Sequence, residues 1–181
     1  MASDRAGLLC ALRALALGLL YAAAVLPACA AAQTASEAAL KAAFIYNFAL
    51  FTEWPAAALA PDAGLSICIH PASQLGATLT DLNLQAIRGH QVLIQSTPNL
   101  RSCHILLLDA LDRPELARIK QMLHSSNVLT ITDMPEPAPG DAIIALSVAN
   151  KRVVFDIDLT AAHQAQLSIS SKLLRLARNV Q

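Results

Sequence analysis

The stretch from Lys41 to Pro55 is an apolar helical pattern with almost no polar face: Lys41-Ala-Ala-Phe-Ile-Tyr-Asn-Phe-Ala-Leu-Phe-Thr-Glu-Trp-Pro55. Its polar members Lys41, Asn47 and Glu53 fall on three different sides of a helix, so no polar stripe can be drawn through them. The pattern therefore predicts a helix covered on most sides, by its own domain or by a partner. Because Pro55 disfavours helical geometry for the preceding residue, we expect this helix to end near Glu53.

The start of the same helix is indicated by Thr34 and Glu37, which form a capping box that satisfies two orphan amides. Beyond the helix, short apolar runs alternate with amphipathic segments. Strands are expected at residues 65–69, 91–96, 103–108, 127–132, 142–148 and 152–158, and helices at 74–87, 113–124, 159–165 and 172–180. This alternation predicts an α/β fold: a central mixed sheet with a parallel core, a C-terminal antiparallel hairpin around residues 149–151, and helices on both faces.

The N-terminal residues 1–32 have the three parts of a secretory signal peptide that is removed on export. Arg5 and Arg13 supply the positive region, an apolar run follows at residues 14–25, and small residues provide A-x-A cleavage sites. A transmembrane anchor is the alternative, but the run is short for a bilayer and lacks flanking charges. The sequence Leu26-Pro-Ala-Cys29 also resembles a lipoprotein box, which leaves lipidation of Cys29 open.

The remaining residues, 33–181, have the size of a single domain. No later apolar run reaches transmembrane length, so we expect the mature chain not to span a membrane. The whole chain is formally neutral, and removing Asp4, Arg5 and Arg13 leaves it near −1. This balance gives no electrostatic argument for nucleic-acid binding.

Cysteine usage is informative because Cys10 and Cys29 precede the expected domain, which leaves Cys68 and Cys103. Two cysteines in an exported chain are most simply a disulfide, and two buried free thiols are the alternative. A bond closing this 35-residue loop would stabilise the fold by about 4 kcal/mol. It would also require the two cysteine strands to be neighbours in the sheet, because bonded Cα atoms lie about 4.4–6.8 Å apart. The strand at 91–96 then cannot lie between them, and we expect both strands to be central and parallel, with helix 113–124 over one face.

The sequence offers little catalytic chemistry. No glycine-rich phosphate loop is present, and the five histidines lack the close spacing of a metal site. A hydrolase would need a positioned base such as His163 near Ser168, Ser170 or Ser171, yet no G-x-S-x-G motif frames these serines, which suit a helix N-cap better. Asp156 and Asp158 alternate on a strand and are explained by its solvent face. We therefore expect no enzyme, no cofactor and no metal.

Two surfaces remain as candidate partner or ligand contacts. Trp54, the only tryptophan, follows Glu53 at the expected helix end, although a lone tryptophan is more often part of a core. Lys172, Arg175 and Arg178 gather on one face of the expected final helix, where they could meet an acidic partner or membrane headgroups. A solvated helix face with cations near the C-terminal dipole is the simpler interpretation.

The Lys41–Pro55 stretch closely resembles the opening signature of the YfiR/HmsC-like family of exported bacterial proteins. Three later segments agree with the family in order and spacing: Cys103-His-Ile-Leu, Val153-Val-Phe-Asp-Ile-Asp-Leu159 and Leu167-Ser-Ile-Ser-Ser-Lys-Leu-Leu-Arg-Leu-Ala177. The resemblance covers nearly all of the expected mature chain. It implies an α/β fold, frequent homodimerisation and a disulfide at Cys68 and Cys103. A second disulfide present in some members has no cysteines here.

Members of the YfiR type are periplasmic repressors that bind the periplasmic sensor domain of a membrane-anchored diguanylate cyclase, and so limit cyclic-di-GMP and biofilm formation. The resemblance thus implies a non-enzymatic repressor with a diguanylate cyclase as partner. The alternative, from a different class, is a periplasmic small-ligand sensor in which the Trp54 end of the first helix lines a pocket.

Overall fold

The computed structural model describes residues 26–70, 73–96, 99–109, 111–134 and 137–181, with side chains from residue 37 onward. The chain divides into two compact units, residues 1–37 and residues 38–181. Helix α2 (Leu26–Leu50) contains the boundary between them. Residues 1–25 and the side chain of Cys29 lie outside the described part, so the signal peptide at 1–32 and the lipidation of Cys29 stay predictions.

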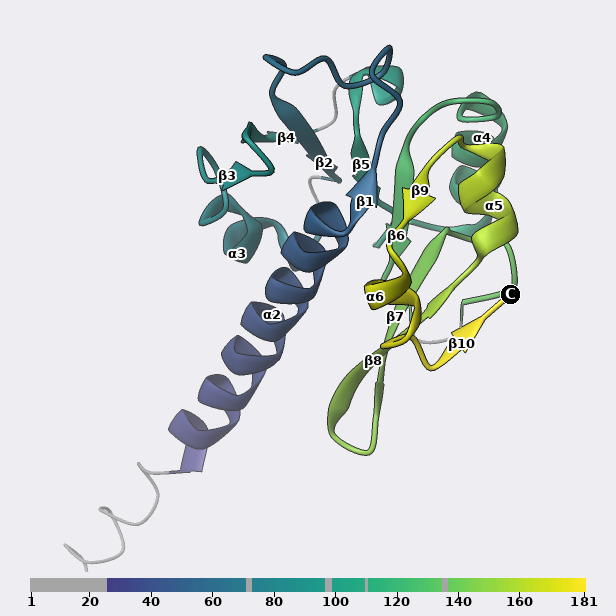
Figure 1. The fold of residues 1–181 in the computed structure, drawn as a ribbon. Coiled ribbons are helices and arrows are strands. Elements are labelled where there is room, and N and C mark those ends of the chain that lie inside the picture. The colour runs from purple at the N-terminus through teal and green to yellow at the C-terminus, as the bar shows by residue number, and fades with distance from the viewer. Residues whose placement is uncertain (1–25, 71–72, 97–98, 110, 135–136) are drawn as a thin grey trace, which may run out of the picture. The chain divides into compact units, whose positions relative to one another are not determined.

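The second unit is built on an eight-stranded mixed sheet with the order β10-β8-β7-β6-β5-β2-β4-β3 (Figure 1). Its strands are β2 (Leu65–Ile69), β3 (Ala86–Ile87), β4 (His90–Ser96), β5 (Ile105–Leu107), β6 (Leu129–Thr132), β7 (Ile144–Ala149), β8 (Arg152–Ile157) and β10 (Asn179–Val180). Strands β4, β2, β5, β6 and β7 are parallel to one another, whereas β7–β8 and β3–β4 are antiparallel hairpins. A separate antiparallel pair joins β1 (Thr52–Glu53) to β9 (Ser168–Ile169). The predicted mixed sheet with a parallel core and a late hairpin is confirmed.

The other helices of the described residues are short. They are α3 (Gly76–Thr80), the 3-10 turn η1 (Leu100–Ser102), α4 (Arg113–Met122), α5 (Leu159–Gln164) and α6 (Ser171–Leu174). Asp112 caps α4 by accepting a hydrogen bond from the Glu115 amide at 2.8 Å. The helix expected over 74–87 is wrong beyond Thr80, because the residues that follow pair with β4 and form the β3–β4 hairpin instead.

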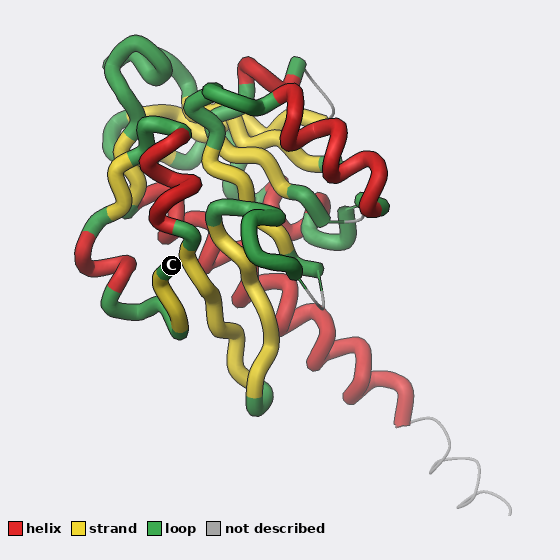
Figure 2. The backbone as a smooth tube through the Cα atoms, turned by 90° about the vertical axis from the view of Figure 1, so that its right-hand side faces the viewer, coloured by secondary structure: helices red, strands yellow, loops and turns green. Residues whose placement is uncertain are grey.

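Buried strand residues alternate between two hydrophobic clusters, one on each face of the sheet. In the run Ile105–Leu108, the odd positions join the larger cluster and the even positions join the smaller one. Helices α2, α3, α5 and α6 contribute to the larger cluster, and α4 covers the smaller one through Leu116 and Ile119. Helices therefore lie on both faces, as predicted (Figure 2). A run that is apolar at every position is the expected signature of a strand buried on both sides.

Helix α2 departs from its prediction at both ends. It begins at Leu26, ahead of the expected capping box, and it ends at Leu50, three residues before Glu53. Glu53 is instead part of β1, whose pairing with β9 takes over from helical hydrogen bonding.

The burial of helix α2 also differs from the prediction of a helix covered on most sides. One face carries the buried residues Ile45 and Phe48, while Leu40 on another side is 46 % exposed. The polar Lys41 faces the domain, where its Nζ donates to Asp133 Oδ2 at 2.8 Å. The helix is therefore covered on one side within this chain, and its apolar exposed side explains why no polar stripe could be drawn.

The expected final helix is also wrong. Helix α6 ends at Leu174, and the chain then turns to form β10, which pairs in parallel with β8. The Arg178 amide donates to Phe155 O at 2.8 Å, and its guanidinium binds the Asp156 carboxylate through two nitrogens. Because an unpaired edge of β8 was available, strand pairing replaced the last helical turns.

The cysteine pair occupies the predicted place in the sheet. Cys68 on β2 and Cys103 form a disulfide with Cα atoms 5.8 Å apart. Strand β2 lies between β4 and β5, so β4 is on the far side of β2 from Cys103 although it intervenes in sequence. Cys103 itself is not in a strand as expected, because it ends the η1 turn two residues before β5 begins.

Candidate functional site

A cavity of about 240 Å³ opens where the end of α2, strand β1 and the β3–β4 hairpin meet. Its lining residues come from four segments of the chain: Ala49, Thr52, Glu53, Trp54, Leu59, Leu65, Ile87, Arg88 and His90. Two of the candidate contact residues, Glu53 and Trp54, therefore lie in one wall. Trp54 is partly buried rather than standing at an exposed helix end, because the helix stops before it and β1 carries it against the sheet.

Two polar atoms in this wall are buried without a hydrogen-bond partner. Thr52 is 1 % exposed, and its Oγ1 contacts no donor or acceptor among the described residues. The indole Nε1 of Trp54 is in the same state. Buried hydroxyl and indole groups normally find a partner, since an unpaired one costs about 1–3 kcal/mol. The cavity thus contains unused hydrogen-bonding capacity.

Charged groups stand at the mouth of the cavity. Arg88 Nη2 donates to Glu53 Oε1 at 2.8 Å, and both side chains are roughly half exposed. His90 Nδ1 lies 2.9 Å from the carbonyl oxygen of Ala63. Since a carbonyl can only accept, Nδ1 of His90 is the donor in this bond.

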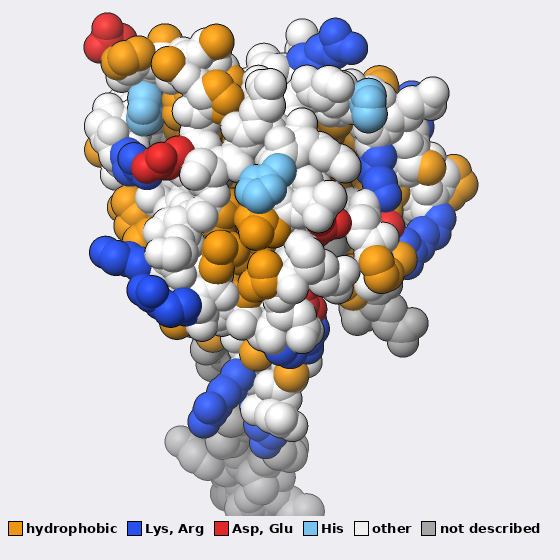
Figure 3. Space-filling model, turned by 45° about the vertical axis from the view of Figure 1, so that its right-hand side comes forward, with side chains coloured by type: hydrophobic (Ala, Val, Ile, Leu, Met, Phe, Trp, Pro, Cys, Tyr) orange, Lys and Arg blue, Asp and Glu red, His pale blue; other side chains and the backbone are white. Residues whose placement is uncertain are grey.

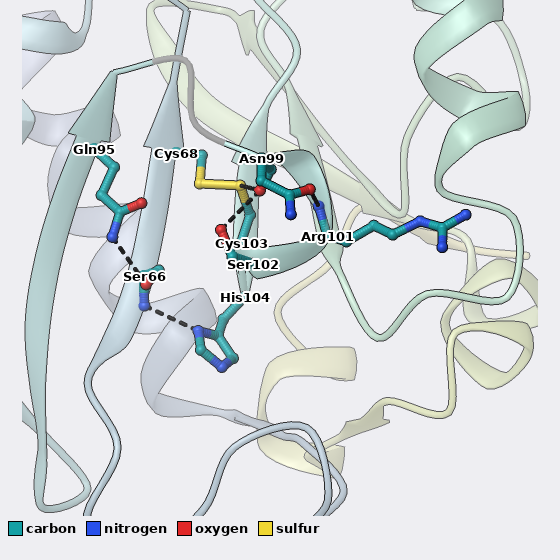
Figure 4. Close-up of a disulfide and its surroundings, with 8 residues drawn as sticks. All are labelled: Ser66, Cys68, Gln95, Asn99, Arg101, Ser102, Cys103 and His104. Atoms are coloured by element: carbon teal, nitrogen blue, oxygen red, sulfur yellow. Dashed lines mark hydrogen bonds between the residues drawn. A yellow bond between two sulfur atoms is a disulfide. The ribbon is translucent and has the colours of Figure 1, made fainter.

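The ring of Trp54 packs against His104, which directly follows the disulfide-bonded Cys103. The two rings meet edge to face with centroids 6.3 Å apart. The His104 Nδ1 accepts from the Ser66 amide at 3.0 Å (Figure 4). Its Nε2 donates to the Ala58 carbonyl at 3.1 Å. Both bonds require a neutral imidazole with one tautomer. Burial is the main reason that the pKa of His104 is lowered; the bond to Ala58 opposes the shift and the charge of His90 adds to it.

The basic residues at the C-terminus do not form the helical stripe that the sequence predicts. Lys172 lies in α6, Arg175 caps its end, and Arg178 is engaged with Asp156 on β8. That ion pair lowers the pKa of Asp156, chiefly through the hydrogen bond from Arg178. Lys172 and Arg175 are exposed, and Leu176 beside them is 70 % exposed. The three form a small surface of mixed basic and apolar character.

One face of the molecule has hydrophobic side chains grouped in its middle, and lysine and arginine side chains scattered toward its edges (Figure 3). Cations on that face are not gathered into one continuous surface. Such a distribution suits contact with another protein, where apolar area and separate charges both contribute.

Two of the side chains considered for catalysis serve as helix caps. Ser170 caps α6 by accepting from the Lys172 amide, and Asp158 caps α5 by accepting from the Ala161 amide. The backbone of Ser168 pairs with Glu53 in the β1–β9 ladder. His163 is exposed on α5. Among the described residues, no group of three or more His, Cys, Asp or Glu side chains could hold a metal ion. In the same part of the chain, no helix is both long and apolar enough to cross a membrane.

Sequence reasoning placed Glu53 and Trp54 in a candidate site but missed Thr52, Arg88 and His90. The helix expected over 74–87 concealed the hairpin that presents Arg88, because Arg88-Gly89 is not one of the strong hairpin dipeptides. Nothing in the sequence marks Thr52 as buried without a partner.

The family model described as YfiR/HmsC-like matches residues 38–178, which is most of the chain and nearly all of the second unit. No curated protein shows a significant match. The match includes each of the segments that carried the resemblance, from the end of α2 to the C-terminal turn. This chain therefore belongs to the YfiR/HmsC-like family.

Proposed function

We propose that the protein is a periplasmic repressor that binds the periplasmic sensor domain of an inner-membrane diguanylate cyclase, and thereby lowers cyclic-di-GMP and biofilm formation. The observation that carries the proposal is the match to the YfiR/HmsC-like family over residues 38–178. The family is periplasmic, regulatory and non-catalytic, and it is associated with diguanylate cyclases. The helix-capping roles of Ser170 and Asp158 support a binding function over hydrolysis.

The surface formed by Lys172, Arg175 and Leu176 is the contact that we assign to the partner. It combines an exposed leucine with two cations that no ion pair among the described residues engages. Leu173 of α6 is 2 % exposed and anchors this segment in the larger hydrophobic cluster, so the surface is held rigidly. Arginine is one of the residues enriched at binding hot spots, and Leu176 adds apolar area beside Arg175.

Deleting the gene should raise cellular cyclic-di-GMP, and a plasmid copy of the gene should return it to the wild-type level. A copy without residues 2–32 should leave cyclic-di-GMP high, because the proposal places the action in the periplasm. Unchanged cyclic-di-GMP in the deletion strain, with no membrane protein recovered on cross-linking, would refute the repressor function.

The contact surface is tested with Lys172→Glu/Arg175→Glu, which reverses two exposed charges. The matched control is Lys151→Glu/Arg152→Glu at the β7–β8 turn, because it makes the same change in net charge at another exposed place. The first variant should lose repression and the second should keep it. Equal loss in both would show that overall charge, not this surface, governs binding. Sedimentation of both variants would also report on the expected homodimer.

A further inference from the structure

We propose that a second cavity, at the carboxyl ends of β2 and β5, binds a small, uncharged aliphatic molecule that carries a hydroxyl group. The cavity has a volume of about 180 Å³ and shares no lining residue with the cavity beside Trp54. The proposal goes beyond the repressor function and does not depend on it, because binding is measured on the isolated protein. It rests on the sheet topology, on a gap beside α4 and on the chemistry of the lining.

The cavity lies where the sheet changes its direction of winding. The next parallel strand after β2 is β4, on one side of it, whereas the next after β5 is β6, on the opposite side. Strands β2 and β5 are neighbours, and the cavity reaches Ile69 and Leu107, the last residues of the two strands. The crevice at the carboxyl ends of two such strands is where open α/β sheets bind their ligands. The topology therefore gives a reason for a site here that is independent of the cavity volume.

The gap beside α4 arises from a short connection. The chain between β4 and β5 passes β2, and the described part of this connection holds only the three-residue turn η1. A crossover between parallel strands usually carries a full helix. Because η1 is so short, a space remains between Leu100 of η1 and Ile119 and Met122 of α4, over Cys68 of β2.

The lining favours an uncharged ligand. Its acidic and basic members are Glu115 and Arg118, which lie one turn apart on α4 with Arg118 Nη2 3.9 Å from Glu115 Oε1. Their side chains are 36 % and 70 % exposed, so they stand at the mouth and compensate each other. A charged ligand would lose its hydration inside without gaining a counter-ion of its own. The interior is formed mainly by aliphatic side chains: Leu100, Leu106, Leu111, Ile119 and Met122.

His70 adds a polar side chain at the carboxyl end of β2, apart from the ion pair at the mouth. An imidazole ring has nitrogens that donate or accept according to tautomer, and a hydroxyl group can do both, so it suits either nitrogen.

The volume of the cavity limits the ligand to a short chain. A benzene ring of six carbon atoms binds in an engineered apolar cavity of roughly 150 Å³. In proportion, about 180 Å³ corresponds to about seven heavy atoms. Hexan-1-ol has this size. The unbranched side chain of Met122 can also adjust to the shape of such a chain.

Hexan-1-ol is therefore the probe, and hexanoate and hexylammonium are its charged counterparts. Met122 lines the cavity and Met134 does not, so the methyl resonance of Met122 reports binding and that of Met134 is an internal control. Hexan-1-ol should shift the Met122 resonance saturably at about millimolar concentration, and both ions should bind at least about tenfold more weakly. Absence of a saturable shift, or equal binding of either ion, would overturn the proposal.

Chain length separates a cavity of limited size from adsorption to an apolar surface. Each added methylene group should strengthen binding about fourfold as long as it is buried. Affinity should therefore rise from butan-1-ol to hexan-1-ol and stop rising before octan-1-ol, whose end would lie outside the cavity. A continued rise to octan-1-ol would assign the shift to adsorption and refute the site.

Two variants and a matched control locate the binding. Leu111→Phe fills part of the cavity from a partly buried position and should weaken hexan-1-ol binding about tenfold. Leu40→Phe makes the same substitution on the exposed side of α2 and should leave binding unchanged. Ile119→Val removes one methyl group from the wall, so the length limit should move to heptan-1-ol. Unchanged affinity in folded Leu111→Phe, equal weakening in Leu40→Phe, or an unchanged length limit in Ile119→Val would each contradict the site.

Discussion

Reduction of the Cys68–Cys103 bond should lower the free energy of unfolding by about 4 kcal/mol. The bond closes a sequence separation of 35 residues, and the loop entropy that it removes from the unfolded chain corresponds to that value. The folded state changes little on reduction, because the two sulfurs stay where they are. Cys68 is 0 % and Cys103 3 % exposed, and both pack in the cluster under α4.

This loss is large for a domain of this size. Single domains have total stabilities of about 5–15 kcal/mol. For roughly 150 residues, each kcal/mol moves the melting temperature by about 2–4 °C, so the reduced protein should melt about 8–16 °C lower. The bond also connects β2 to the start of β5 in the middle of the sheet. We therefore expect the loss of stability on reduction to affect the whole domain and not one edge of the sheet.

Urea unfolding of the mature protein with and without a phosphine reductant measures the difference directly. The variant Cys68→Ala/Cys103→Ala is the control, because its midpoint should not respond to the reductant. It should also be slightly less stable than the reduced wild type, since removing two buried sulfur atoms leaves small cavities. A change below about 1 kcal/mol on reduction, or alkylation of both cysteines in the native unreduced protein, would refute the reasoning.

Three further predictions concern single residues. Burial holds the folded-state pKa of His104 below its unfolded value near 6.5, so the contribution of His104 to stability should be full above that pH and decline below it. The variant His104→Asn should flatten this decline in urea titrations between pH 7 and 5. Asp156→Asn should cost about 1 kcal/mol at pH 7, and because the pKa of Asp156 is lowered by Arg178, the difference from wild type should fade as the pH falls below about 4. Gly64→Ala should destabilise the fold by about 1 kcal/mol in thermal melts, because its Cβ would lie 2.5 Å from Leu93 Cδ1.

The parts of the fold that the sequence predicts are those whose local pattern has one physical solution. The run Ile105–Leu108 is apolar at every position, which suits only a strand covered on both faces. Residues 149–151 join two alternating segments, and the structure forms a two-residue turn there with Asn150 and Lys151 at positive φ. The distance limit on the expected disulfide predicted that β2 and β5 are neighbours and that β4 does not lie between them, which the strand order confirms.

The errors arose where a tertiary partner decides between two locally acceptable structures. The segment after Leu174 has a good helical pattern, yet the free edge of β8 and the Asp156 carboxylate draw it into a strand. The segment after Thr80 likewise forms a hairpin with β4. The candidate site contains residues of both kinds. Trp54 could be selected from the sequence because it is the only tryptophan, whereas Arg88 could not, because its place in the site depends on the β3–β4 hairpin.

The disulfide and the cavity are parts of one arrangement. Cys103 is fixed to β2, and the adjacent His104 then binds the Ser66 amide of β2 and the Ala58 carbonyl of the loop after β1. The same imidazole supports the ring of Trp54, whose indole nitrogen faces no partner in the protein. Because each contact fixes the next, the covalent bond in the core determines where an unpaired donor in the cavity wall is held. A site that leaves polar atoms unpaired needs such rigidity, since a flexible wall would turn those atoms toward water.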